Sequence, residues 1–238
     1  MSSNAEEIRQ GNQYILAKSD RNINDDWFDP EKLRHKGLLQ GKAQGRGNAW
    51  FVRLENTDCV LRHYYRGGAM AKLLHDRYIW TGLSRTRAWQ EWHLLAKLCK
   101  LNLPAPLPVA ARVQRKGLFY RADLITRQIP NTQTLAQRLS RTALTASLWQ
   151  GVGKTIAKFH AENVWHADLN ARNILIDRDN KVFLIDFDKA KTRPPSKKWQ
   201  QDNLQRLSRS LHKINNSGES LHFDNDDWKQ LVQGYNAF

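Results

Sequence analysis

The chain has 238 residues with a formal net charge of +15, and 40% of its residues are hydrophobic. This length accommodates one large domain or two small lobes, and the composition excludes a disordered chain. The excess of positive charge favours an anionic partner, such as nucleic acid, an anionic lipid surface or a phosphorylated substrate, without choosing among them.

The N-terminal residues lack the basic segment and apolar stretch that an export signal needs. No uninterrupted apolar run in the sequence is long enough to span a bilayer, so we expect any membrane association to be peripheral. The two cysteines, Cys59 and Cys99, make neither a disulfide framework nor a paired zinc motif, which fits a reducing cytosol.

The first half of the chain predicts a small antiparallel β-sheet with one long helix. A glycine-bearing stretch at 41–48 precedes two short strands rich in aromatic and β-branched residues, which a polar turn separates. Trp and Leu residues then recur at helical intervals until the prolines at 103–108 end the helix. We expect strands at 50–54 and 59–64, a helix at 86–100, and strands at 109–114 and 118–125.

The second half of the chain is mainly helical. Apolar residues at helical spacing predict three helices, and two short apolar runs between them predict a strand pair. The predicted architecture is α+β with two lobes, residues 1–128 and 129–238, and a cleft between such lobes is a natural ligand site. We expect helices at 133–139, 143–163 and 199–214, and strands at 174–176 and 182–185.

Acidic and amide residues flank the predicted strand pair. Asp168 follows His166 by two residues, Asn173 follows Asp168 by five, and an Asp-Phe-Asp element begins at Asp186. Phosphoryl transfer needs a carboxylate that accepts a hydroxyl proton and oxygen ligands that hold Mg²⁺ against nucleotide phosphates. The spacing is that of the kinase catalytic loop and metal element, and it indicates an ATP- and Mg²⁺-dependent phosphotransferase with Asp168 as its base. The alternative, that these are ordinary turn acids, does not explain the whole ordered set.

Upstream residues follow the same order. Gly45 and Gly47 lie in a stretch whose backbone amides can approach phosphates, and a hairpin tip is the alternative interpretation. Arg62 ends a strand where kinases place a phosphate-pairing lysine. Glu91 lies in the middle of a predicted helix, where kinases place the carboxylate partner of that lysine; alone, it would be read as a solvated helix residue.

A second glycine pattern, Gly151-Val-Gly-Lys-Thr155, is similar to the end of a P-loop. That motif requires glycine where this sequence has Leu148, and the segment continues an amphipathic helix instead of following a strand. We therefore reject a P-loop here.

The segment HADLNARNILID, followed by FLIDFDKA, closely resembles the lipopolysaccharide kinases of the protein-kinase-like superfamily, and among them those that act on 3-deoxy-D-manno-octulosonic acid (Kdo). LRHYYRGG from Leu61 and NLQRLSRSL from Asn203 strengthen the resemblance, which covers about residues 35–215. It implies a two-lobed kinase-like fold and transfer of the γ-phosphoryl group of ATP to the 4-hydroxyl of Kdo on a lipid A precursor. It also implies roles for single residues: Asp168 as base, Asn173 and Asp186 as Mg²⁺ ligands, and Gly45, Gly47, Arg62 and Glu91 as residues that position the triphosphate.

Three departures from the sequence pattern of regulated protein kinases limit the class of acceptor molecule. Ala167 replaces the Arg that senses a phosphorylated activation loop, the metal element reads D-F-D, and no A-P-E motif follows. Arg62 also replaces the usual lysine, and arginine is a larger, planar phosphate ligand. These features favour a small-molecule or glycolipid acceptor over a protein.

Two basic runs suit an anionic acceptor. Residues 62–87 carry six Lys and Arg against one acid, and a second run at 189–198 follows the Asp-Phe-Asp element. We expect a Kdo-modified lipid A precursor as partner, peripheral contact with the cytoplasmic side of the inner membrane, and no nucleic acid. A solvated basic face is the alternative interpretation of the charge. The alternative functions are a heptose kinase, another small-molecule kinase, or a non-catalytic kinase-like module that binds nucleic acid or membrane. Among small-molecule acceptors, the basic face argues against a cationic aminoglycoside.

Overall fold

The computed structural model describes residues 5–18, 23–42, 49–66, 76–216 and 221–238. Contacts divide the chain into two compact units, which we call unit 1 (1–96 and 107–128) and unit 2 (97–106 and 129–238). Among the helices that the structure describes, none combines the length and apolar character that crossing a bilayer takes. Each unit is taken by itself below.

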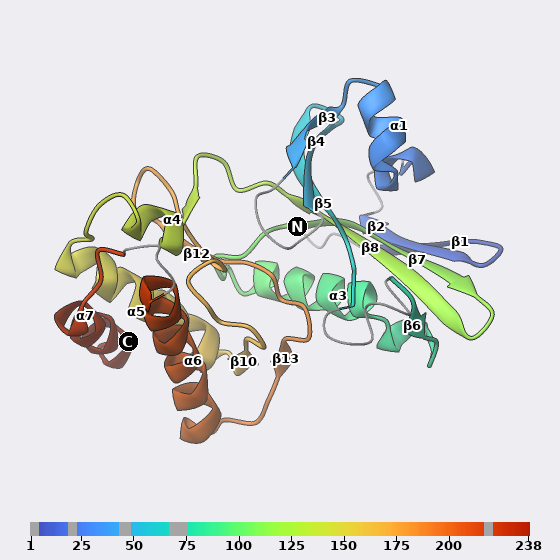
Figure 1. Cartoon of the computed structure of the whole chain (residues 1–238). Coiled ribbons are helices and arrows are strands. Elements are labelled where there is room, and N and C mark those ends of the chain that lie inside the picture. The colour runs from blue at the N-terminus through green and yellow to red at the C-terminus, as the bar shows by residue number, and fades with distance from the viewer. Residues whose placement is uncertain (1–4, 19–22, 43–48, 67–75, 217–220) are drawn as a thin grey trace. The chain divides into compact units, whose positions relative to one another are not determined.

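Unit 1 is built on an antiparallel sheet with two α-helices (Figure 1). The strand order is β1-β2-β7-β8-β5-β4-β3, and β6 pairs with β8 beyond this path. The elements are β1 (Ala5–Gln10), β2 (Gln13–Lys18), the 3-10 helix η1 (Asp25–Phe28), α1 (Pro30–His35), β3 (Leu39–Lys42), β4 (Ala49–Leu54), β5 (Thr57–His63), β6 (Tyr78–Ile79), the 3-10 helix η2 (Leu83–Arg85), α3 (Arg87–Lys100, whose last turn belongs to unit 2), β7 (Pro108–Lys116) and β8 (Phe119–Arg127).

The register assigns alternate residues of the central strands to opposite faces of the sheet. Leu61 of β5 is opposite Ile125 of β8, and both belong to a buried cluster with Phe28 of η1 and Leu33 of α1. Arg62 is opposite Leu124, and side chains of successive residues point to opposite faces. Arg62 therefore leaves the sheet on the face that does not carry the Phe28–Leu33 cluster.

Unit 2 is mainly helical, with a two-stranded sheet (β10-β13) and a three-stranded sheet (β12-β11-β9) that hold the polar loops (Figure 1). Thr134 caps α4 with a capping box, and Thr145 caps α5, so both helices begin later than apolar periodicity alone predicts. The elements are β9 (Gln133–Thr134), α4 (Leu135–Leu139), α5 (Ala146–Ala161), β10 (Val164–Trp165), β11 (Ile174–Ile176), β12 (Val182–Leu184), β13 (Lys191–Thr192), α6 (Lys197–Asn216) and α7 (Asn225–Asn236).

Helices α5 and α7 approach each other closely through glycines. A Cβ added at Gly153 would lie 2.0 Å from the carbonyl oxygen of Leu231, and one added at Gly234 would lie 2.1 Å from that of Gln150. Any larger residue would force the helices apart. Gly153, in the segment rejected above as a P-loop, thus serves helix packing.

The α+β architecture predicted from the sequence is confirmed, and most predicted elements occur with shifted ends. The helix predicted at 133–139 was wrong at its start, because Gln133 and Thr134 pair with β11 before α4 begins. The glycine stretch was also misread at its start, since 39–42 is strand β3. The sequence analysis did not predict β1, β2, β6, β10, β13, α1 or α7.

Candidate active site

The loop between β10 and β11 carries Asp168 and Asn173. Amide side chains of this loop donate hydrogen bonds to its own backbone. Nδ2 of Asn173 donates to the backbone carbonyl of Asp168 at 2.9 Å, and Nδ2 of Asn170 donates to the same oxygen at 3.0 Å. The two predicted functional residues of this loop are therefore joined by a direct hydrogen bond.

His166 connects this loop to the strand that precedes Asp186. Its side chain is buried, and burial lowers the pKa of the imidazole below its usual value, so the ring is neutral. Nδ1 accepts the backbone N–H of Asp168 at 3.2 Å, which leaves the proton on Nε2 to donate to the carbonyl of Ile185 at 2.9 Å. One neutral histidine is thus hydrogen-bonded to the backbone of Asp168 and to that of Ile185, the residue before Asp186.

Asn173 and Asp186 lie at the same end of the β11–β12 hairpin. Ile174 is opposite Leu184, and the N–H of Ile185 donates to the carbonyl of Asn173 at 3.0 Å. The backbone of Asp186 has φ of 62°, in the left-handed region that costs a non-glycine residue free energy and is concentrated at functional sites.

The donor set at this end of the hairpin fits Mg²⁺. Because the Nδ2 of Asn173 donates to Asp168, its Oδ1 is the amide atom left for a metal, and Asp186 supplies a carboxylate. Within the described residues, no group of three or more His, Cys, Asp or Glu could hold a metal ion. Magnesium is often bound by one or two protein oxygens together with phosphates and waters, so these two hard donors are sufficient.

A polar stripe on helix α6 forms hydrogen bonds with the same loop. The stripe consists of Asn203, Arg206 and Ser210, which share one face of the helix by their spacing. Buried Asn203 accepts the N–H of His166 at 3.2 Å and donates to its carbonyl at 2.9 Å. Ser210 Oγ accepts the N–H of Ala171 at 3.1 Å.

Arg206 contacts the predicted base itself. Its Nε and one terminal nitrogen both donate to Oδ1 of Asp168, at 3.0 and 2.5 Å. The two side chains are about half exposed, 48% for Arg206 and 50% for Asp168. Such an exposed pair adds little to stability but orients the carboxylate, and it leaves Oδ2 as the oxygen that can accept a proton.

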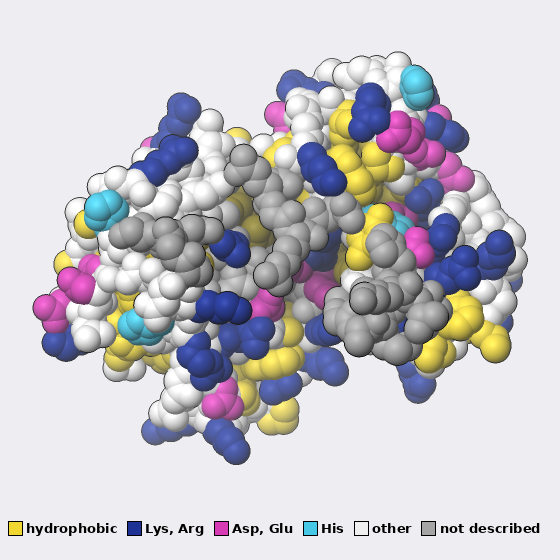
Figure 2. Space-filling model, viewed as in Figure 1, with side chains coloured by type: hydrophobic (Ala, Val, Ile, Leu, Met, Phe, Trp, Pro, Cys, Tyr) yellow, Lys and Arg dark blue, Asp and Glu magenta, His cyan; other side chains and the backbone are white. Residues whose placement is uncertain are grey.

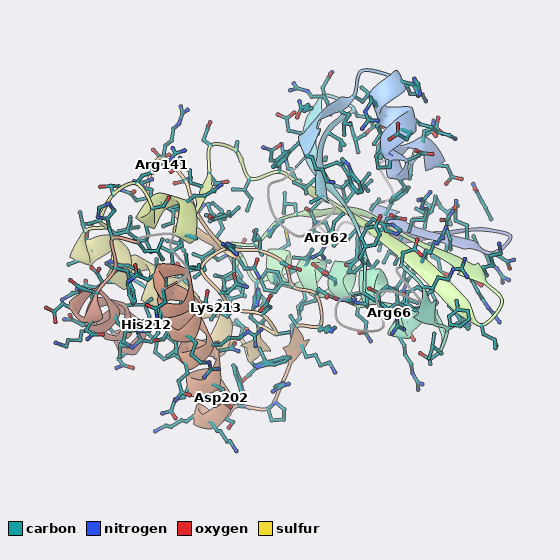
Figure 3. The ribbon with its side chains drawn as sticks, viewed as in Figure 1. Arg62, Arg66, Arg141, Asp202, His212 and Lys213 are labelled. Atoms are coloured by element: carbon teal, nitrogen blue, oxygen red, sulfur yellow. The ribbon has the colours of Figure 1, made fainter. Side chains whose placement is uncertain are left out.

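Unit 1 holds the other two predicted residues that the structure describes. Arg62 of β5, labelled in Figure 3, forms an ion pair with Glu91 of α3, whose side chain is 3% exposed. Tyr64 donates its hydroxyl to the same carboxylate at 2.7 Å, and Arg62 donates to that hydroxyl at 3.1 Å. Burial, and then the charge of Glu91, raise the pKa of Tyr64 well above its usual value, so the phenol stays protonated.

The predicted site residues thus fall into three groups. Asp168, Asn173 and Asp186 are brought together in unit 2, and Arg62 and Glu91 are brought together in unit 1. Gly45 and Gly47 lie outside the described residues.

The sequence analysis missed Asn203 and Arg206 as functional candidates, although it used their helix as a sign of resemblance. Only the apolar face of that helix was read for its spacing. The signal that would have found them is a polar stripe at helical intervals beside that face.

Comparison with known proteins adds a family and named relatives. Residues 31–235 match the model of the "Lipopolysaccharide kinase (Kdo/WaaP) family". A 3-deoxy-D-manno-octulosonic acid kinase of Vibrio vulnificus (strain YJ016) is 42% identical over 88% of each chain. Kinases of the same name from Mannheimia succiniciproducens and Haemophilus influenzae (strain 86-028NP) are 38% and 37% identical, each over 96% of this chain and 98% of the relative.

Proposed function

Because this chain belongs to the lipopolysaccharide kinase (Kdo/WaaP) family and is a kinase, we propose that it phosphorylates Kdo on a lipid A precursor. The phosphoryl donor is ATP, whose use the family implies, and the acceptor is the 4-hydroxyl of the sugar. The product is a phosphorylated inner core of lipopolysaccharide.

The observation that most supports this proposal is that hydrogen bonds connect Asp168 to Asn173 and to the strand before Asp186. His166 and Asn173 hold them together through backbone contacts of 2.9 to 3.2 Å. A non-catalytic module has no need to retain a base and two oxygen ligands in such an arrangement, so we favour an enzyme over a binding module.

Asp168 is the base in this proposal, and Arg206 is a positioning residue. The guanidinium group holds Oδ1, so that Oδ2 faces the incoming hydroxyl and accepts its proton. The hydroxyl oxygen then bonds to the γ-phosphorus of ATP as the bond from that phosphorus to the bridging oxygen breaks and ADP leaves. Because the pair is half exposed, an acceptor can reach the carboxylate without prior opening of the protein core.

The remaining predicted residues serve the nucleotide. Oδ1 of Asn173 and the carboxylate of Asp186 would hold Mg²⁺, which when bound neutralises charge on the phosphates during transfer. Arg62, oriented by Glu91, would pair with phosphate oxygens, and its planar guanidinium suits them. Gly45 and Gly47 would allow backbone amides to approach the same phosphates.

The acceptor class agrees with the charge of the chain. A Kdo-modified lipid A precursor carries phosphate and carboxylate groups, and the chain has a net charge of +15. Exposed lysines of the second basic run, Lys189, Lys191, Lys197 and Lys198, suit such a substrate and the anionic cytoplasmic face of the inner membrane. We therefore place the enzyme at that face as a peripheral protein.

The acceptor is tested by incubating the chain with Mg-ATP and Kdo-modified lipid A precursor, followed by mass spectrometry. We expect the acceptor to gain the mass of one phosphate, and fragmentation to place it on the 4-hydroxyl of Kdo. A parallel reaction with a heptose-containing acceptor that lacks Kdo should give no product. Phosphorylation of heptose alone would refute the proposed substrate.

The role of Asp168 is tested by Asp168→Asn, with Asp179→Asn as matched control. Asp179 is an exposed acid in the turn of the β11–β12 hairpin, so its substitution should leave kcat unchanged. Asp168→Asn should lower kcat by at least about 10²-fold, the lower range for a general base, while ATP still binds. Near-normal turnover by Asp168→Asn would remove this residue from the mechanism.

A further inference from the structure

Two hydrophobic side chains at one end of the unit 1 sheet are largely exposed. Leu118, in the turn between β7 and β8, is 76% exposed, and Ile79 of β6 is 61% exposed. Their backbones lie side by side at this end of the sheet, because Ile79 is opposite Phe119 and the N–H of Trp80 donates to the carbonyl of Leu118 at 2.9 Å. Single exposed hydrophobic residues are ordinary, but two at the same end of one sheet indicate a contact surface.

The hairpin tip is held rigidly. Gly117 takes a φ of +60°, which favours glycine, and Lys116 is opposite Phe119 on either side of the turn. Trp80 stacks on Tyr14 at 5.8 Å between ring centroids, and the guanidinium of Arg115 lies 5.1 Å from the Trp80 ring centre. A turn usually carries polar residues at its apex, so Leu118 has no evident role in the fold. Binding through a preformed tip costs little conformational entropy.

Cations surround this tip. A pocket of about 360 Å³ beside it is lined by Arg77, Arg115, Lys116 and Arg121, together with Gln114, Phe119 and Tyr120. None of these seven described residues is acidic, although Arg121 also forms an ion pair with Asp76 at 2.7 Å. Figure 2 shows hydrophobic side chains next to Lys and Arg side chains over this end of the sheet.

We propose that this β6–β8 surface, defined by Arg77, Ile79, Arg115, Lys116, Leu118 and Arg121, docks the kinase on an anionic phospholipid bilayer. Leu118 and Ile79 enter the boundary between headgroups and acyl chains, and the basic pocket takes lipid phosphate groups. The inference deepens the proposed function, on which it rests, because a lipid A precursor is reached at a membrane.

The aliphatic tip favours a bilayer over nucleic acid. Single-stranded nucleic acid is bound by aromatic rings on which bases stack. Here Trp80 already contacts Tyr14 and Arg115, and Leu118 and Ile79, the two most exposed large hydrophobic side chains among the described residues, have no ring. Aliphatic residues flanked by Lys and Arg are typical of interfacial membrane contacts.

The test is co-sedimentation of the full chain with vesicles of phosphatidylcholine and phosphatidylglycerol in equal parts. The variant Ile79→Thr/Leu118→Ser removes the aliphatic tip, and Phe238→Ser, at a side chain 57% exposed, is its matched control. We expect the double variant to bind vesicles at least about tenfold more weakly, and the control to bind within about twofold of the unaltered chain.

A second pair of variants tests the charge. Arg77→Gln/Lys116→Gln should weaken vesicle binding by about fivefold per charge and reduce its sensitivity to salt. Arg141→Gln/Lys213→Gln removes two exposed cations of unit 2, labelled in Figure 3, and should have little effect. Vesicles of phosphatidylcholine alone should bind the unaltered chain weakly.

Turnover separates docking from catalysis. With a de-acylated, water-soluble Kdo acceptor, the tip variant should keep its full kcat, whereas with vesicle-embedded acceptor its rate should fall in parallel with vesicle binding. Unchanged vesicle binding by both surface variants would overturn the docking proposal, as would loss of binding to an RNA oligonucleotide with vesicle binding intact. If the unaltered chain phosphorylates neither acceptor, the proposed function fails while the vesicle result still decides the docking surface.

Discussion

Replacement of Asn203 by alanine tests how helix α6 supports the catalytic loop. The amide of Asn203 is 2% exposed and satisfies both the N–H and the carbonyl of His166, at 3.2 and 2.9 Å. Alanine leaves two buried backbone groups without these hydrogen bonds, each at a cost of about 1–3 kcal/mol. Since alanine is the better helix former by about half a kcal/mol, we expect a net loss near 3 kcal/mol.

Thermal unfolding followed by circular dichroism measures this loss. For a chain of this size each kcal/mol lowers Tm by about 2–4 °C, so Asn203→Ala should melt about 6–12 °C lower. Well below its Tm the variant should also lose at least about tenfold in kcat, because His166 begins the loop that positions Asp168. ATP binding should change much less than kcat.

The matched control is Asp202→Ala on the exposed face of the same helix (Figure 3). Its Tm should stay within about 2 °C of the unaltered chain, since exposed substitutions rarely exceed about half a kcal/mol. If Asn203→Ala behaved like this control in both Tm and kcat, the reasoning that α6 holds the loop through this amide would be refuted.

Three further predictions concern packing, pH and the ion pair. Gly153→Ala should lower the free energy of unfolding by at least about 2 kcal/mol, because its Cβ would lie 2.0 Å from a backbone oxygen of α7. Gly151→Ala, whose Cβ meets nothing within 4 Å among the described residues, should stabilise by up to about 1 kcal/mol; equal melting of the two variants contradicts this. Burial lowers the pKa of His160 from 6.5 to about 4, so between these values the unfolded chain binds a proton that the folded chain does not. Stability should therefore fall by about 2 kcal/mol from pH 8 to pH 5, and the contribution of this group should level off below about pH 3. The free energy of unfolding of His160→Gln, measured in urea, should lack this part of the decline with pH. A pH profile identical to that of the unaltered chain would exclude His160 as its cause. Arg62→Met should cost about 3–5 kcal/mol by removing the ion pair of buried Glu91, and Arg62→Lys should recover most of it; no difference between the two would rule out the charge as the cause.

Features that are local in the chain could be read from the sequence. Apolar residues at helical spacing predicted α3, α5 and α6. The close spacing of Asp168, Asn173 and Asp186 indicated a base followed by metal ligands, and these roles stay a prediction. The resemblance of that segment led to the lipopolysaccharide kinases, and the family match confirms it. Each of these signals depends on residues within about 20 positions of one another.

Elements with weak local patterns were missed. Five of the six residues of β1 are exposed, so the strand shows no alternation of apolar and polar residues. Its pairing with β2, which in turn pairs with β7, places it in the sheet. Helix α7 approaches α5 through Gly153 and Gly234, and a glycine carries no hydropathy signal that would predict a packing partner. The same glycine gave the false likeness to a P-loop.

The sequence by itself determined the chemical class, because the predicted base and metal ligands are close in the chain and their spacing is specific. Only the tertiary structure decided what holds them. Arg206 reaches Asp168 across 38 positions, and Asn203 reaches His166 across 37. The exposed pair of Leu118 and Ile79 likewise became visible only in the folded sheet. Hydrogen bonds and exposure between distant residues follow from how whole elements pack, which no local propensity specifies.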